Sequence, residues 1–273
     1  MKVLFVFGTR PEAIKLSPVI EEFRRHSSIE VVLCVTAQHR GMLDQVLNLF
    51  DLRPQYDLDI MLADQSLFDV TSAGLLGIRD VLEKEQPQIL LVQGDTTTAF
   101  VGSLAAYYLN IPVAHVEAGL RTGDKHHPFP EEINRTICDT LSDILFAPTK
   151  RARDNLLREG IQGNRIHVTG NTAVDALLRT AQHLQGVDYP PGLDSPLSDN
   201  LKYWTESNAR VILVTSHRRE SFGPGLENIC SALKEIAHRN PDTHVIYPVH
   251  LNPNVRDPAY RILGNEERVH LID

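Results

Sequence analysis

Residues 89–135 read ILLVQGDTTTAFVGSLAAYYLNIPVAHVEAGLRTGDKHHPFPEEINR, and this stretch decides the fold. The apolar run 89–93 has the length of a strand that is buried on both faces, and it ends just before Asp95. Threonines then supply N-cap chemistry for a helix, and a second strand over 112–116 ends at Glu117. The order strand, helix, strand predicts a right-handed parallel unit, so Asp95 and Glu117 should lie on the same edge of the sheet.

That edge is where open α/β sheets bind their ligands. A helix predicted to begin at Pro130 adds Glu131 above the same edge. Carboxylates held near one another repel, so at least one tends to have a raised pKa, and an acid and a base arise from one residue type. Proton transfer needs such a pair. An alternative interpretation is that these carboxylates are helix caps and solvated loop charges.

The chain begins with a strand over 2–7, which is followed by GTRPEAIK at 8–15. Pro11 suits the first helical position, where its missing N–H costs nothing. A glycine turn into a helix N-terminus directs free backbone N–H groups at an anion, and Arg10 and Lys15 add positive charge. We therefore predict a phosphate site, with an ordinary turn and two surface cations as the alternative. The turn matches neither GxGxxG nor a Walker loop, which argues against a dehydrogenase or an ATPase.

A third strand, over 211–214, leads into TSHRRESFG. His217 stands at the carboxyl end of this strand, beside Arg218 and Arg219. The two arginines favour the neutral imidazole and make the loop suitable for an anion. A lone histidine is more often structural than catalytic, so a phosphate contact and a structural role both stay open.

The whole chain alternates strand and helix patterns, which is typical of α/β proteins. At 273 residues, 42% of them hydrophobic, it has room for one or two such domains. We predict a first domain over 1–170 and a second over 171–273. The proline-containing segment 186–200 is the clearest loop, and we place it within the second domain.

Composition and charge exclude several classes of function. A net charge of −8 argues against a nucleic-acid surface, which needs a basic face. Cys34, Cys138 and Cys230 form no CxxC pair, so zinc ribbons and disulfide frameworks are unsupported and a reduced, cytoplasmic compartment fits. No stretch has the length of a membrane span or the pattern of a signal peptide. We expect no metal, no cofactor, no nucleic acid and no membrane partner.

Stretches along nearly the whole chain resemble the bacterial non-hydrolysing UDP-N-acetylglucosamine 2-epimerases. They are GTRPEAIKLSPVI at 8–20, VTAQHRGMLDQVL at 35–47, QGDTTTAF at 93–100, HVEAGLRTGD at 115–124, PFPEEINR at 128–135, VTGNTAVDALL at 168–178, HRRESFGPGLENIC at 217–230 and YPVHLNPNVRDP at 247–258.

The resemblance implies two Rossmann-like domains in a glycosyltransferase-B-like architecture. It implies the interconversion of UDP-GlcNAc and UDP-ManNAc, by elimination of UDP to 2-acetamidoglucal and its re-addition, which supplies ManNAc-type sugars for surface polysaccharide. It also implies a homodimer that forms through helices of the first domain.

Site residues follow from the same resemblance. The residues that match the family's catalytic groups are Asp95, Glu117, Glu131 and His217. The residues expected to contact the UDP-sugar are Arg10, Lys15, Asp95, Glu117 and His217. Which carboxylate takes the proton and which returns it stays open.

Some members of the family hold a second UDP-GlcNAc molecule as an activator. Arg218 and His250 match residues of that site. Gly41 and Ala73, however, stand where the activator-binding pattern has Gln and Arg, so two polar donors are missing.

The family continues beyond the apolar strand expected at 269–273, so we expect the second domain to be incomplete. Whether this chain turns over its substrate therefore stays open. Two other interpretations remain: a glycosyltransferase that uses a UDP-sugar, since fold does not determine function, and a fragment that binds nucleotide sugars without catalysis.

Overall fold

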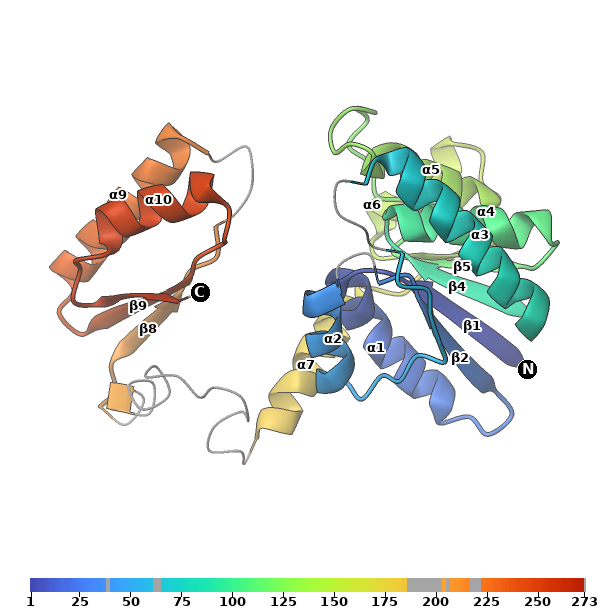
Figure 1. The fold of residues 1–273 in the computed structure, drawn as a ribbon, viewed down its shortest axis with the longest axis horizontal. Helices are drawn as coiled ribbons and strands as arrows, with labels where there is room; N and C mark the ends of the chain where they lie inside the picture. The colour runs from blue at the N-terminus through green and yellow to red at the C-terminus, as the bar shows by residue number, and fades with distance from the viewer. Residues whose placement is uncertain (38–39, 61–64, 186–202, 205–206, 217–221, 273) are drawn as a thin grey trace. The chain divides into compact units, whose positions relative to one another are not determined.

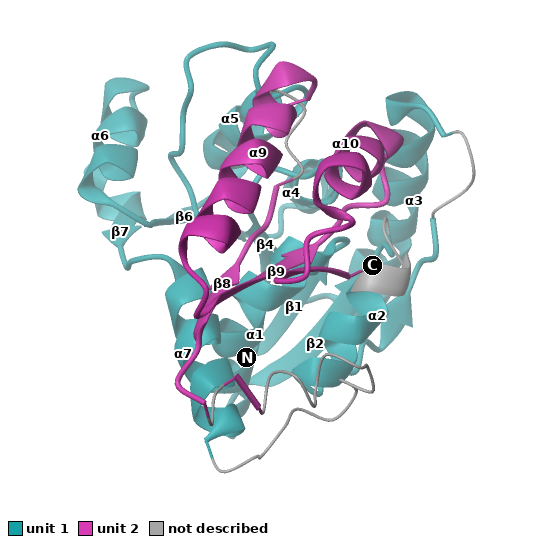
Figure 2. Ribbon diagram, turned by 90° about the vertical axis from the view of Figure 1, so that its left-hand side faces the viewer, with its two compact units in different colours: residues 1–185 teal, residues 186–273 magenta. Residues whose placement is uncertain are grey.

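A computed structural model describes the chain, apart from the side chains of 40–42 and all of residues 38–39, 61–64, 186–202, 205–206, 217–221 and 273. The chain divides into two compact units (Figure 2). Unit 1 is Met1–Gln185 and unit 2 is Gly186–Asp273.

Unit 1 is built on one parallel sheet with the strand order β3-β2-β1-β4-β5-β6-β7. Its elements in chain order are β1 (Lys2–Phe7), α1 (Arg10–Arg24), β2 (Glu30–Val35), α2 (Arg40–Leu49), β3 (Tyr56–Asp57), α3 (Leu67–Glu85), β4 (Ile89–Gln93), α4 (Thr97–Tyr108), β5 (Val113–Val116), α5 (Glu131–Leu141), β6 (Ile144–Ala147), α6 (Lys150–Arg158), a 3-10 turn (Gly163–Arg165), β7 (Ile166–Val168) and α7 (Thr172–Leu184). The predicted parallel unit is confirmed by β4, α4 and β5.

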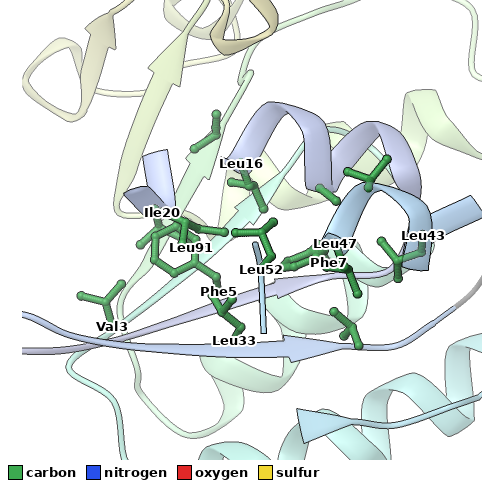
Figure 3. Packing of buried hydrophobic residues seen from close by; sticks show 14 of the residues in the cluster. Val3, Phe5, Phe7, Leu16, Ile20, Leu33, Leu43, Leu47, Leu52 and Leu91 are labelled. Carbon is green, nitrogen blue, oxygen red and sulfur yellow. The ribbon is translucent and has the colours of Figure 1, made fainter. Parts of the chain in front are cut away.

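Helices cover both faces of this sheet (Figure 1). Alternate residues of β1 enter two different cores: Phe5 and Phe7 pack with α1 and α2, whereas Leu4 and Val6 pack with α3 and α4. Figure 3 shows the first of these cores, with the helix residue Leu16 above the strand side chains. Burial on both faces explains why the strands read as continuous apolar runs.

Unit 2 repeats the α/β pattern on a smaller scale, so the predicted α/β class with a second Rossmann-like unit is confirmed. Its described elements are β8 (Arg210–Leu213), α9 (Pro224–Arg239), β9 (Thr243–Pro248), α10 (Pro253–Leu263) and β10 (Val269–Ile272). The strands are parallel in the order β10-β9-β8, and a core of α9 and α10 side chains packs around Tyr247.

The boundary between the units differs from the expected one at residue 170. Helix α7 lies beyond that boundary in the sequence, yet it packs against α1 and belongs to unit 1. An ion pair between Arg179 and Glu21 joins the two helices, and Ala176 is buried. The expected loop over 186–200 lies outside the described residues.

None of the described helices has the length and apolar character to cross a membrane. The described residues also contain no group of three or more His, Cys, Asp or Glu side chains arranged to hold a metal ion.

Gly8 follows β1 and packs tightly against two threonines. A Cβ added at Gly8 would lie 2.1 Å from Thr36 Oγ1 and 2.4 Å from Thr98 Oγ1, and these two hydroxyls are themselves hydrogen-bonded at 2.8 Å. Because overpacking displaces side chains and backbone, we predict that Gly8→Ala lowers the free energy of unfolding by about 1–3 kcal/mol. Urea denaturation followed by circular dichroism measures this difference.

Gly163→Ala is the matched control in the same unit. Its added Cβ would meet only Leu157, at 3.7 Å, so the free energy of unfolding should change by no more than about 0.5 kcal/mol. Equal stability of the two variants would contradict the packing described for Gly8.

Candidate active site

Asp95 and Glu117 lie at the same edge of the unit 1 sheet, as the sequence predicts. Asp95 follows β4 and Glu117 follows β5, and these strands pair in parallel with Gln93 opposite Val116. Glu131 is the first residue of α5, which packs against α4. Three carboxylates from three segments are thus placed around the carboxyl end of the sheet.

Glu117 is held by a cation from α1. The Lys15 ammonium lies 2.7 Å from both carboxylate oxygens, and the Asn171 side-chain amide donates to Oε2 at 3.3 Å. Glu117 has a φ of 72°, a backbone conformation that is uncommon for residues other than glycine and that clusters at functional sites. Lys15 was expected to add positive charge at the phosphate site before α1. It also contacts a candidate catalytic carboxylate.

Asp95 is held by α5. Its carboxylate pairs with the Arg135 guanidinium, and its backbone carbonyl accepts a hydrogen bond from the Asn134 side chain at 3.0 Å. Each of the two strand-end carboxylates thus pairs with a different cation, Arg135 for Asp95 and Lys15 for Glu117, and Arg135 also faces Glu132 at 3.3 Å. These cations offset the mutual repulsion on which the sequence argument for an acid and a base relied.

Glu131 differs from the other two carboxylates. It is half-buried in the first turn of α5, where the helix dipole favours a negative charge. Within the part of the chain that the structure describes, its carboxylate makes no hydrogen bond or ion pair, so among the three carboxylates it is the one that has no cation there.

The glycine turn before α1 does not offer all of its N–H groups to an anion. The Glu12 carboxylate accepts hydrogen bonds from Gly8 N at 3.0 Å and Thr9 N at 2.8 Å, and its other oxygen accepts from Thr96 Oγ1 at 2.7 Å. The prediction that these two N–H groups are free is therefore wrong, because the chain supplies its own carboxylate. Arg10 is exposed at the start of the helix.

Glu12 is only 1% exposed, and this burial determines the direction in which the pKa of its carboxyl group shifts. Burial raises the pKa of its carboxyl group, although the hydrogen bonds from Thr96 and the turn act in the opposite direction. Through Thr96, the residue after Asp95, Glu12 links the first strand-to-helix turn to the second.

A buried ion pair lies beneath this edge. His115 is 0% exposed and Asp139 is 1% exposed. The ring nitrogens of His115 contact Asp139 Oδ1 and the Gly94 carbonyl oxygen, each at 2.7 Å. Asp139 also accepts from Gly119 N and faces Arg121, which favours its ionised form. The carboxylate and the carbonyl are then both acceptors, so both ring nitrogens donate and the ring is an imidazolium.

The electrostatics agree with this protonation state. Burial by itself lowers the pKa of His115, but the Asp139 charge and the two hydrogen bonds raise it overall. Burial by itself raises the pKa of Asp139, but His115 and Arg121 lower it overall. This pair was not predicted from the sequence, although a histidine inside the apolar run of β5 was the available signal.

The candidate residues of unit 2 are less informative. His217 and Arg218 lie outside the described residues. His250 follows β9, is exposed, and accepts a hydrogen bond from the backbone N–H of Asn252 at 3.1 Å. Gly41 lies in α2 and Ala73 in α3. The activator site stays a prediction.

Known proteins resemble this chain over its whole length. Residues 21–273 match the family model described as UDP-N-acetylglucosamine 2-epimerase. The chain is 52% identical to the UDP-N-acetylglucosamine 2-epimerase of Yersinia pestis and 51% identical to that of Escherichia coli K12, and each match covers 100% of this chain and 72% of the relative. The structure superposes with a TM-score of 0.87 and 46% identity on the UDP-GlcNAc 2-epimerase of Neisseria meningitidis bound to UDP-GlcNAc, covering 100% of this chain and 72% of that one.

The imidazolium of His115 makes the stability of unit 1 depend on pH. Its folded pKa is raised, so its contribution is fully present below the unfolded value near 6.5 and is lost as the pH rises through the folded pKa. We predict that His115→Gln lowers the free energy of unfolding by about 3–5 kcal/mol at pH 6, because it breaks a buried pair. Urea denaturation across the alkaline range should show the difference from wild type shrinking.

His183→Gln is the matched control. His183 is exposed in α7, and its replacement should change the free energy of unfolding by no more than about 0.5 kcal/mol. A destabilisation by His115→Gln that grows toward alkaline pH would contradict the assigned charge.

Proposed function

Because the chain belongs to the UDP-N-acetylglucosamine 2-epimerase family, we propose that it interconverts UDP-GlcNAc and UDP-ManNAc. The observation that carries the proposal is the set of carboxylates at one sheet edge: Asp95 and Glu117 emerge from paired strands, and Glu131 opens α5. A similar protein, from Neisseria meningitidis, is bound to UDP-GlcNAc. Carboxylates of this kind suit proton transfer at a sugar carbon.

The chemistry must overcome an unactivated proton at C2, because no carbonyl group adjoins that carbon. In the proposed reaction one carboxylate removes the C2 proton while the bond from C1 to the UDP oxygen breaks, which leaves 2-acetamidoglucal and free UDP. The UDP oxygen then bonds to C1 again, and a carboxylic acid delivers a proton to the opposite face of C2. Asp95, Glu117 and Glu131 are the groups that we propose for these two transfers.

The leaving diphosphate needs positive charge. Arg10 is exposed at the start of α1, and a guanidinium suits a diphosphate because it can donate two hydrogen bonds in parallel. Lys15 lies five residues further along α1 and contacts Glu117, so its charge acts on the carboxylate as well as on an approaching anion. We propose Arg10 and Lys15, with His217, as the diphosphate contacts.

Three further statements extend this proposal. We propose that the chain forms a homodimer through helices of unit 1, works in the cytoplasm, and supplies ManNAc-type sugars for surface polysaccharide. The cysteines, which are all buried and unpaired, agree with a reducing compartment. Sedimentation that shows only monomer would contradict the dimer.

Proton NMR of UDP-GlcNAc in D2O with the purified chain tests the function. Deuterium entering C2 together with a growing UDP-ManNAc signal is the expected result. Consumption of UDP-GlcNAc only when an acceptor is present, with C2 unchanged, would instead identify a glycosyltransferase. Binding of UDP without exchange at C2 would identify a nucleotide-sugar-binding protein without this activity.

Glu117→Gln keeps the shape of the side chain and removes its charge. We predict that it abolishes epimerisation and leaves the affinity for UDP largely intact, because the carboxylate acts on the sugar rather than on the diphosphate. NMR gives the turnover and calorimetry the affinity. Glu83→Gln, on an exposed position of α3, makes the same change in charge and should turn over normally. Unchanged turnover of Glu117→Gln would remove Glu117 from the mechanism.

Arg10→Ala should weaken the binding of UDP. The loss of one hydrogen bond to a charged group corresponds to about 1.5–3 kcal/mol of binding free energy, which calorimetry resolves. Arg24→Ala, at the other end of the same helix, is the matched control and should bind UDP like wild type. If both variants bind equally well, the diphosphate lies elsewhere.

A further inference from the structure

The buried His115–Asp139 pair touches each segment that carries a candidate catalytic carboxylate. His115 Nε2 donates at 2.7 Å to the carbonyl of Gly94, the residue immediately before Asp95. His115 itself lies in β5, two residues before Glu117. Asp139 lies in α5, the helix that begins at Glu131. The pair thus connects the three segments at one buried point.

The second oxygen of Asp139 extends this connection to the other side of Glu117. Asp139 Oδ2 accepts a hydrogen bond from the backbone N–H of Gly119 at 3.1 Å and faces the Arg121 guanidinium at 2.8 Å. His115 and Gly119 are both hydrogen-bonded to Asp139, so the backbone is held on both sides of Glu117 in the sequence. Such restraint suits a residue with a φ of 72°, a conformation that persists only where the surroundings enforce it.

We propose that His115 and Asp139 are positioning residues, and that their ion pair sets the placement of the Asp95 and Glu117 carboxylates relative to each other. The inference rests on the proposed epimerase function. Neither side chain has access to the sugar, since both are buried, so they act through the backbone of the residues that they hold.

The positive charge of His115 is necessary for this positioning role. The charged groups that face it are Asp139 from α5, at hydrogen-bond distance, and Asp95 from the turn after β4, through its longer-range field. Arg121 lies on the far side of Asp139. A neutral imidazole donates through only one nitrogen, so deprotonation would release either Gly94 or Asp139.

Asp139→Asn tests the proposal, since it keeps the size of the side chain and removes the charge that holds the imidazolium. We expect the rate of deuterium entry at C2 to fall about 100-fold, the scale of a misplaced catalytic group, with the dissociation constant for UDP unchanged within about twofold. Glu159→Gln is the matched control: it removes the other carboxylate that Arg121 contacts, leaves His115 untouched, and should exchange C2 like wild type.

A second measurement reports on the protonation and the contacts of the His115–Asp139 pair and does not require turnover. In nitrogen-15 NMR of the wild-type chain, both ring nitrogens of His115 should be protonated at neutral pH, and Asp139→Asn should move the amide signals of Gly94, Asp95 and Glu117. A wild-type chain that shows no exchange at C2 would contradict the proposed function, and these signals would still test the positioning role. A neutral His115 ring would overturn the inference, as would unmoved amide signals in a folded Asp139→Asn variant.

A loss of UDP affinity that parallels the loss of exchange would also overturn it, because that outcome indicates a general structural role. His115→Asn is a second variant for the case that Asp139→Asn does not fold. Asn has no equivalent of the Nε2 donor that contacts the Gly94 carbonyl, so this variant should lower the exchange rate and keep the affinity for UDP.

Discussion

A solvent-free ion pair between His115 and Asp139 is the interaction on which the carboxyl edge of the unit 1 sheet depends. Removing two charges from water is expensive, and a buried pair is stable only if its remaining donors and acceptors are also satisfied. Here both imidazolium N–H groups have acceptors, and Asp139 accepts from Gly119 N and faces Arg121 as well. The pair therefore holds the segments around Asp95 and Glu117 in one arrangement.

Burial separates the carboxylates of this edge into two groups with different tasks. Glu12 and Asp139 are about 1% exposed and are surrounded by donors, so they stabilise turns and loops. Asp95 and Glu117 have side chains that are 31% and 12% exposed, and each meets one cation at the surface of the sheet edge. The carboxylates of the second group are accessible and can meet a sugar, as can the half-buried Glu131. The same residue type thus serves structure and chemistry within a few residues.

The parts of the molecule that local pattern determines could be predicted from the sequence. The apolar runs ending at Asp95 and Glu117 sufficed to place both carboxylates at one edge, because strands buried on two faces read as continuous apolar segments. The ion pairs could not be predicted from the sequence, because Lys15 meets Glu117, and His115 meets Asp139, only after the chain has folded. The same reason explains the domain boundary, since the attachment of α7 to α1 is a tertiary contact.

The most direct test of the account is a crystal structure of the Glu117→Gln variant with UDP-GlcNAc bound. The account predicts that C2 of the sugar lies about 3–3.5 Å from a carboxyl oxygen of Asp95 or Glu131 or from the side-chain amide at position 117, above the ends of β4 and β5. A sugar ring bound away from this edge, with these side chains facing only protein or solvent, would contradict it.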